Sequence, residues 1–378
     1  MPRVCIAGYF PPPITGQTLA TERLAALLED EFAVTRVPLN RERQEAVETA
    51  PGFRLSKVRG YIEGGGALRA ALRATTPDVL LWPSISPQTI GHLRDLLTVA
   101  PALSRVRRRY GVVHWGNFQT LYASPLTRYS ATWLSKRLDG LVFLNADLAG
   151  ACAGWLPDTP RHVIPNTIDD ALLFDEAAIA EKQRARRSRR SLRILFLSNM
   201  IASKGYLDVV EAADLLRRDG IPFELRMIGR WIDPEDRRAF EQRVAGDLAA
   251  SITHLGAVSD RAAIRGHHAW ADVFLFPTYY PTEAQPLVLL EAMSAGTPVV
   301  TTAHAGIPAM FAPEGEAVFV PPRAPRALAE AVRSLTDPDA WMARSRGVRA
   351  RFESDFSPEA VRRRWRDLIA SPSGGGRA

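Results

Sequence analysis

The sequence has few of the features that mark membrane-spanning, secreted or disulfide-bonded proteins. No stretch approaches the roughly 18 consecutive apolar residues of a membrane-spanning helix. The first residues run directly into an apolar segment typical of a strand, without the pattern of a signal peptide. Only two cysteines occur, Cys5 and Cys152, and they provide neither a disulfide framework nor a thiolate metal site. We therefore expect a cytoplasmic protein.

Signatures of metal, dinucleotide and nucleic-acid sites are also scarce. His267, His268 and His304 have no other ligating side chains at a spacing that suits a metal. The loop after the first predicted strand, residues 10–18, lacks the G-x-G-x-x-G pattern of dinucleotide-binding folds. No zinc-finger spacing, RNA-binding aromatic motif or long basic arm is present. We expect no metal, no cofactor and no nucleic-acid partner.

The positive charge is concentrated in the first half of the chain. Residues 1–165 contain 19 Lys and Arg against 13 Asp and Glu, whereas residues 192–378 contain 23 of each. Arg105, Arg107, Arg108 and Arg109 form the densest cluster. A basic face attracts anionic lipid or a phosphorylated substrate, but it is also the ordinary result of an arginine-rich, solvated surface. The composition leaves both interpretations open.

The length and the apolar pattern predict two α/β domains. A chain of 378 residues is too long for one ordinary core. Short continuous apolar runs alternate with helix-patterned segments in each half, which is typical of buried parallel strands. The predicted strands are Val4–Ala7, Phe32–Leu39, Val79–Trp82, Gly111–His114, Leu141–Asn145 and His162–Pro165, then Arg193–Ser198, Glu224–Ile228, Ile252–Leu255, Val273–Pro277, Pro298–Thr301 and Ala317–Val320. Two Rossmann-like, doubly wound domains with a ligand cleft between them are expected.

The predicted boundaries follow from composition. Residues 1–168 form the first domain, and the charged stretch 169–191 reads as a linker or hinge. Residues 192–355 form the second domain. An amphipathic helix at 356–370 is expected to return to the first domain, and the Gly/Ser-rich residues 371–378 are expected to be a disordered tail.

Residues 276–300, FPTYYPTEAQPLVLLEAMSAGTPVV, hold two glutamates in a strand–loop–helix–strand segment. The spacing places Glu283 in the loop and Glu291 inside the helix, on the order of 10 Å apart at ~1.5 Å per helical residue. A retaining hydrolytic carboxylate pair needs roughly 5 Å, so the spacing suits an elongated ligand with phosphates between its hydroxyl-bearing ends. Backbone N–H groups at the helix start would favour those phosphates, namely those of Ala284, Gln285, Leu287 and Val288. The plainer alternative is a capped helix with a glutamate that is buried incidentally.

This segment resembles the retaining GT-B glycosyltransferases of family 4, the glycosyl transferases group 1 type, whose signature is two glutamates separated by seven residues. Four further strings resemble that family in the same order along the chain: YGVVHWGNF, VIPNTID, FLSNMIASKGYLDVVEAADLL and ELRMIGRW. The resemblance covers nearly the whole chain. It implies a GT-B fold in which the first domain binds the acceptor and the second binds a nucleotide-sugar donor.

The resemblance also implies roles for single residues. Glu291 would hold the donor ribose, Glu283 would lie at the transferred sugar, and Lys204 would face the pyrophosphate. Lysine is rare in this chain, with four lysines against 44 arginines, so Lys204 is not explained by composition. An ammonium group is a common phosphate partner.

Three further positions follow the family only in part. The family often has an arginine five residues before its lysine, where this chain has Asn199, and Arg230 is a candidate substitute. The N-terminal loop keeps a single glycine, Gly16, near the expected donor phosphate. His114, at the end of a predicted strand, would contact the sugar. A structural role is equally open for Gly16, and His114 could instead be a core or capping residue.

The implied activity is transfer of a hexose-type sugar, with retained configuration, from a UDP- or GDP-linked donor to a glycan acceptor. The basic first half favours a lipid-linked acceptor in envelope polysaccharide synthesis, with the protein peripheral at the inner membrane face. A soluble acceptor is the alternative within this class. A non-catalytic sugar-nucleotide-binding protein and a nucleotide-sugar epimerase remain the alternatives outside it.

Overall fold

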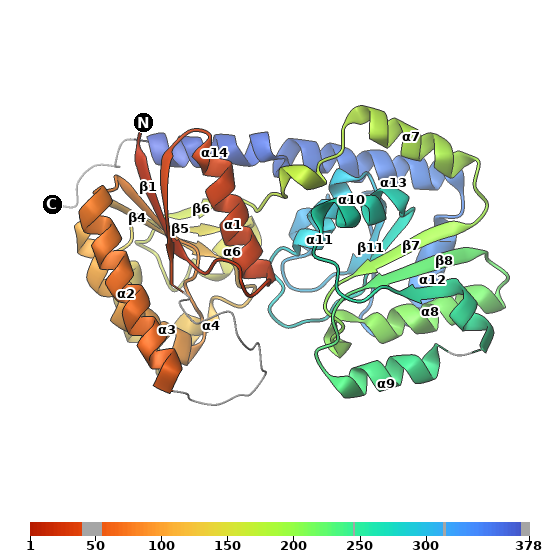
Figure 1. The fold of residues 1–378 in the computed structure, drawn as a ribbon, viewed down its shortest axis with the longest axis horizontal. Helices are drawn as coiled ribbons and strands as arrows, with labels where there is room; N and C mark the ends of the chain where they lie inside the picture. The colour runs from red at the N-terminus through yellow and green to blue at the C-terminus, as the bar shows by residue number, and fades with distance from the viewer. Residues whose placement is uncertain (40–54, 245, 313–314, 372–378) are drawn as a thin grey trace. The chain divides into compact units, whose positions relative to one another are not determined.

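The computed structural model describes residues 1–39, 55–244, 246–312 and 315–371, which fold as two units (Figure 1). Unit 1 comprises Met1–Thr167 and Pro358–Ala378, and unit 2 comprises Ile168–Ser357. Each unit contains one six-stranded sheet in which every strand pair is parallel. The prediction of two doubly wound α/β domains is confirmed. The predicted tail, apart from Ser371, lies outside the described residues.

Unit 1 has the strand order β2-β1-β3-β4-β5-β6. Its strands are β1 (Arg3–Gly8), β2 (Ala33–Pro38), β3 (Val79–Trp82), β4 (Arg108–Val113), β5 (Gly140–Phe143) and β6 (Arg161–Val163). Its longer helices are α1 (Gly16–Glu29), α2 (Leu55–Thr75), α3 (Thr89–Thr98), α5 (Arg128–Ser135), α6 (Ala146–Ala151) and α14 (Pro358–Ala370). The chain steps one way from β1 to β2 and the other way from β2 to β3. Right-handed crossovers therefore place α1 and α2 on opposite faces of the sheet.

Helix α14 completes unit 1 beside α1 (Figure 1). Val361 and Trp365 are buried in one apolar cluster with side chains of α1, β1, β3 and β4. Arg362 pairs with Asp30 at 2.8 Å, at the end of α1. The amphipathic pattern of residues 356–370 thus corresponds to a helix whose apolar stripe covers the sheet of unit 1.

Part of the predicted basic cluster serves this packing. The guanidinium of Arg108 donates to the carbonyl oxygen of Ser371 at 3.0 Å, just beyond the C-terminus of α14, where cations are favourable. Arg109 pairs with Asp139 at 3.0 Å. Arg105 and Arg107 remain exposed. The four arginines are therefore not one continuous solvated face.

Unit 2 has the strand order β12-β11-β10-β7-β8-β9. Its strands are β7 (Leu192–Leu197), β8 (Phe223–Ile228), β9 (Ile252–His254), β10 (Val273–Phe276), β11 (Val299–Thr302) and β12 (Ala317–Val320). Its longer helices are α7 (Glu176–Arg187), α8 (Tyr206–Arg218), α9 (Pro234–Arg243), α10 (Arg261–Trp270), α11 (Leu287–Ser294), α12 (Pro325–Ser334) and α13 (Pro338–Arg351). The strand order reverses between β7 and β10, and ligands of doubly wound sheets bind at such a switch point.

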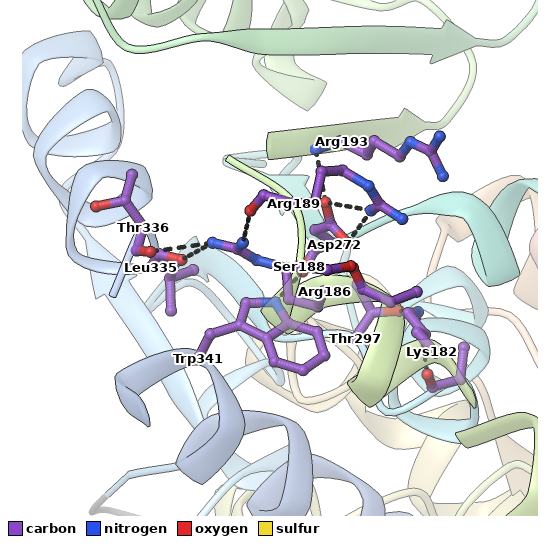
Figure 2. A network of polar contacts seen from close by, with 12 residues as sticks. Lys182, Arg186, Ser188, Arg189, Arg193, Asp272, Thr297, Leu335, Thr336 and Trp341 are labelled. Atoms are coloured by element: carbon purple, nitrogen blue, oxygen red, sulfur yellow. Dashed lines mark hydrogen bonds and ion pairs between the residues drawn. The ribbon is translucent and has the colours of Figure 1, made fainter. Parts of the chain in front are cut away.

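The prediction that residues 169–191 form a linker or hinge is corrected by the structure, because this segment is folded into unit 2 (Figure 2). Lys182 on α7 donates to the carbonyl oxygens of His268 at 2.8 Å and Ala295 at 3.1 Å, at the ends of α10 and α11. Arg186 donates to the carbonyl oxygens of Leu335 and Thr336, both at 3.1 Å. A run of basic residues predicts a solvated segment. Here, however, Lys182 and Arg186 donate hydrogen bonds to carbonyl groups at the ends of helices.

Candidate functional site

The switch point of unit 2 brings together the two charged residues that the sequence places 79 positions apart. Lys204 ends a short 3-10 turn, Ala202–Lys204, in the loop that follows β7. Glu283 lies in the loop that follows β10, and β10 pairs directly with β7. Because the carboxyl ends of neighbouring parallel strands meet at one edge, the two loops must also meet there.

Gly205 makes this close approach sterically feasible. It precedes α8 with a φ of +78°, in the left-handed region that favours glycine. A Cβ at this position would lie 2.5 Å from the carbonyl oxygen of Pro277, the first residue after β10. The amide of Tyr279 then donates to the carbonyl of Ser203 at 2.8 Å, which ties the two loops together. The lysine–glycine pair thus has a structural reason: the glycine lets the lysine-bearing loop touch the end of β10.

Lys204 and Glu283 form an ion pair with little exposure to solvent. The side chains are 15% and 9% exposed, respectively. The hydroxyl of Thr278 donates to the same carboxylate at 3.1 Å. The ammonium group also lies 4.5 Å from the ring centre of Tyr280, within the range of a cation–π interaction. Desolvated charges of this kind persist only when paired, so each of the two groups depends on the other.

Helix α11 begins immediately after this loop. Pro286 is its N-cap and provides no side-chain acceptor, and the first N–H groups of an α-helix have no partner within the helix. Of the four predicted N–H groups, those of Leu287 and Val288 belong to the first turn. Ala284 and Gln285 precede the helix and are buried. The first turn of α11 thus presents its backbone donors beside the Lys204–Glu283 pair.

Glu291 lies within α11 and is 4% exposed. One of its carboxylate oxygens is 3.5 Å from Nε2 of His268 on α10, whose side chain is 1% exposed. The backbone carbonyl oxygen of His268 accepts a hydrogen bond from the ammonium of Lys182 at 2.8 Å. Glu291 is therefore held in the protein interior beside a histidine. No sequence pattern predicts this neighbour, because His268 and Glu291 come together only in the folded unit.

The loops that carry Asn199 and Arg230 run side by side. The amide of Met200 donates to the carbonyl of Arg230 at 2.9 Å, and Met200 forms an isolated parallel bridge with Trp231. Both the Asn199 and the Arg230 side chains are exposed. Arg230, the candidate substitute cation, therefore belongs to a loop whose backbone adjoins the loop that carries Asn199.

The remaining two predicted residues belong to unit 1. Gly16 is the first residue of α1, is exposed, and has open space where a Cβ would lie, so its backbone does not require glycine. His114 directly follows β4 and is half-buried, and burial lowers its pKa to about 4. Its Nε2 atom is buried without a hydrogen-bond partner and the residue borders a cavity of about 20 Å³, roughly one water molecule in size. Both residues belong to unit 1, whereas Lys204, Glu283 and Glu291 belong to unit 2.

Two observations bear on metals and membranes. Among the described residues, no group of three or more His, Cys, Asp or Glu side chains is placed to hold a metal ion. Asp337 and Asp339 form an Asp-x-Asp sequence, but Asp337 caps α13 and accepts from the amide of Asp339 at 2.9 Å. None of the helices in the described ranges is long and apolar enough to span a bilayer.

Comparison with known proteins identifies relatives of this chain. The model of the family described as glycosyl transferases group 1 matches residues 191–337, which lie in unit 2. The amylovoran biosynthesis glycosyltransferase AmsK of Erwinia amylovora is 28% identical over 192 residues, 47% of this chain and 44% of AmsK. The chain therefore matches less than half the length of that relative. Glycogen synthase of Mycobacterium tuberculosis is 32% identical over 286 residues, 71% of this chain and 66% of the relative.

The crystal structure of HepE from Anabaena, in complex with UDP and glucose, has a similar fold, with a TM-score of 0.67 at 15% identity, covering 98% of this chain and all of HepE. Two parallel, doubly wound sheets of this order define the GT-B class of fold. The chain has the GT-B fold, and its unit 2 contains a domain of the glycosyl transferases group 1 family.

Proposed function

We propose that the chain transfers a hexose-type sugar from a UDP- or GDP-linked donor to a saccharide acceptor, with retention of configuration and without a metal ion. The observation that carries this proposal is the Lys204–Glu283 ion pair beside the first turn of α11, at the switch point of unit 2. It offers one cation and backbone donors for a diphosphate, and one carboxylate for sugar hydroxyls. HepE, whose fold is similar, binds UDP and glucose, which is consistent with a donor of this class.

Donor binding would proceed by exchange of partners. A diphosphate competes with Glu283 for the ammonium of Lys204, because both are anionic and the phosphate oxygens carry more charge. The released carboxylate then accepts hydrogen bonds from hydroxyls of the transferred sugar. Glu291 would accept from the donor ribose, and this requires its carboxylate to turn from His268, 3.5 Å away. Asn199 and Arg230 would line the phosphate side.

In the transfer step, the bond between C1 of the sugar and the diphosphate oxygen breaks, and a bond from C1 to the acceptor oxygen forms on the same face. The proton of the acceptor hydroxyl passes to the leaving diphosphate, so no enzyme-bound sugar is formed. Lys204 and the N-terminus of α11 stabilise the negative charge that develops on the diphosphate. His114, which burial keeps neutral, would position a sugar hydroxyl, and Gly16 would lie near the donor phosphate.

The acceptor we propose is a lipid-linked saccharide of an envelope or extracellular polysaccharide. AmsK is named for amylovoran biosynthesis, which supports a polysaccharide setting. The basic excess of the first half favours an anionic acceptor such as a lipid-linked diphosphate saccharide. Glycogen synthase, whose name implies a soluble glucan, supports the alternative of a soluble acceptor.

The test measures release of nucleoside diphosphate by the full chain from UDP-, GDP- and ADP-sugars, with and without lipid-linked and soluble saccharides. We expect release from one class of donor that rises when the acceptor is added, and a loss of at least about a hundredfold in Glu283→Gln. Glu211→Gln, at an exposed position on α8, is the matched control and should keep full turnover. Equal turnover of Glu283→Gln and the native chain would refute the role of Glu283. Donor binding without release would favour a non-catalytic protein, and an altered sugar without acceptor would favour an epimerase.

A further inference from the structure

Helix α3 of unit 1 has its apolar and polar faces inverted. Ile90, Leu93 and Leu97 are 76%, 56% and 67% exposed, and their spacing of three and four residues places them on one face. The residues that α3 buries are polar: His92, Asp95 and Thr98. A helix that packs only against its own domain turns its apolar stripe inward, so this stripe indicates a contact outside the domain.

A second exposed stripe lies on and just before α5. Leu126, Tyr129 and Trp133 are 85%, 87% and 40% exposed, again at a spacing of three and four residues. The two helices are joined directly, because Nε2 of His92 on α3 lies 2.9 Å from the hydroxyl of Ser130 on α5. We call the six exposed apolar residues of these two helices the α3–α5 surface.

The stretch of chain that contains α3 and α5 is rich in basic residues and poor in acidic ones. Between Asp78 and Asp139 the chain contains eight Lys and Arg residues and a single acidic residue, Asp95. Asp95 is 1% exposed and pairs with Arg94 at 2.5 Å, so it does not contribute negative charge at the surface. The exposed cations of this stretch are Arg105, Arg107, Arg128, Lys136 and Arg137.

Trp133 combines both features at one position. The guanidinium of Arg137 lies 3.5 Å from the ring centre of Trp133 and donates to the Trp133 carbonyl at 2.9 Å. An indole covered by a cation, together with the exposed phenol of Tyr129, suits an environment that is apolar on one side and hydrated and anionic on the other. A protein partner rich in acidic residues would be complementary to the cations, but not to six large apolar side chains that protrude singly from two helices.

We infer that the α3–α5 surface docks on an anionic lipid membrane, with its apolar side chains in the interface and its cations at the lipid headgroups. This inference deepens the proposed function, because it supplies a place where a lipid-linked acceptor can be met. It does not depend on the donor site. The free energy of apolar insertion and the free energy of attraction to anionic lipid add to each other. Loss of one stripe, or of the charge, should therefore weaken membrane binding.

The experiment measures cosedimentation of the full chain with vesicles of phosphatidylcholine, with and without phosphatidylglycerol, in the absence of donor and acceptor. We expect binding to the vesicles that contain phosphatidylglycerol, and weaker binding at high salt. Leu93→Glu/Leu97→Glu and Leu126→Glu/Tyr129→Glu should each lower binding by at least about tenfold. These positions are exposed, so the variants should fold, which circular dichroism checks. Ile232→Glu/Leu255→Glu, at exposed apolar positions of unit 2, is the matched control and should bind as the native chain does.

Three results would overturn the inference. The first is that the chain binds neither kind of vesicle, and the second is that the α3–α5 variants bind vesicles as well as the native chain. The third is that the native chain self-associates in sedimentation velocity and the variants do not, which would identify a second copy as the occupant. Vesicle binding together with absent sugar transfer would leave the docking surface intact and refute the proposed function instead. Transfer to a soluble acceptor without vesicle binding would keep the proposed sugar transfer and refute the docking surface.

Discussion

The ammonium of Lys204 and the carboxylate of Glu283 form a largely buried ion pair that joins the loops after β7 and β10. Removing one partner of such a pair leaves the other charge desolvated. Lys204→Met leaves the buried carboxylate of Glu283 with only the Thr278 hydroxyl among these partners, and should cost about 3 kcal/mol of the free energy of unfolding. The double variant Lys204→Met/Glu283→Gln should be more stable than Lys204→Met, although it carries one more substitution.

The measurement is urea unfolding of the native chain, both single variants and the double variant. The coupling free energy in this cycle should be about 1–3 kcal/mol. Strictly additive losses would mean that the two groups do not interact in solution. All four proteins should also be tested for donor binding, because only the variants with Met at position 204 lose the cation that we assign to the diphosphate.

Most of the fold could be predicted from the sequence, because buried parallel strands leave a strong local signal. Runs such as Val79–Trp82 and Val273–Phe276 are apolar without interruption, and both are strands buried on both faces. Helix α3 carries the opposite signal. Its apolar residues are on the outer face and its buried residues are polar, so the pattern does not indicate a core helix.

The candidate site could be predicted as a set of residues but not as a set of contacts. The position of Glu283 before a helix and the rarity of lysine both indicated a phosphate site. That Lys204 pairs with Glu283, and that Glu291 lies beside His268, depends on strand order and helix packing. These relations are non-local, and a single sequence does not encode them in any recognisable spacing.

Gly205 should be intolerant of substitution for two separate reasons. Its φ of +78° disfavours any side chain, and a Cβ would lie 2.5 Å from the Pro277 carbonyl oxygen. Gly220, with a φ of +70° and open space around its Cβ position, shares only the first reason. Gly220→Ala should cost about 1 kcal/mol of unfolding free energy, and Gly205→Ala clearly more. Urea unfolding of both variants measures the loss of unfolding free energy in each, and the difference between the two losses is the steric contribution at Gly205. Equal losses would show that the loop after β7 adjusts freely.

His114 should make the stability of unit 1 depend on pH in the acidic range. Burial lowers its pKa in the folded chain to about 4, whereas the ordinary value is 6.5. Between these values the unfolded chain binds the proton more readily, so the free energy of unfolding should fall as the pH drops from about 6.5 to about 4. His114→Gln should show a flatter profile in this window. Nuclear magnetic resonance of the imidazole checks the cause directly, and titration of His114 near its ordinary pKa would contradict it.

The folded state of residues 169–191 can be tested through Arg189, which pairs with the buried carboxylate of Asp272 at 2.9 Å (Figure 2). Asp272 is 1% exposed and also accepts from the amide of Arg193 at 2.9 Å, at the start of β7. Arg189→Gln removes the cation and leaves the carboxylate buried, so we expect a loss of about 3 kcal/mol in unfolding free energy. Arg187→Gln is the matched control. Arg187 is exposed and lies 4.0 Å from an exposed aspartate, so its loss should stay within about 0.5 kcal/mol.

Urea unfolding monitored by tryptophan fluorescence suits this comparison, because the indole of Trp341 donates to the carbonyl of Asp272 at 2.7 Å and so reports on the same network. If residues 169–191 acted as a hinge that is detached from unit 2, the two substitutions would have equally small effects. A large loss for Arg189→Gln alone would instead show that α7 is anchored to the sheet of unit 2 through the segment that follows it. Any hinge would then have to lie outside this segment, which restricts where the chain can bend during donor binding.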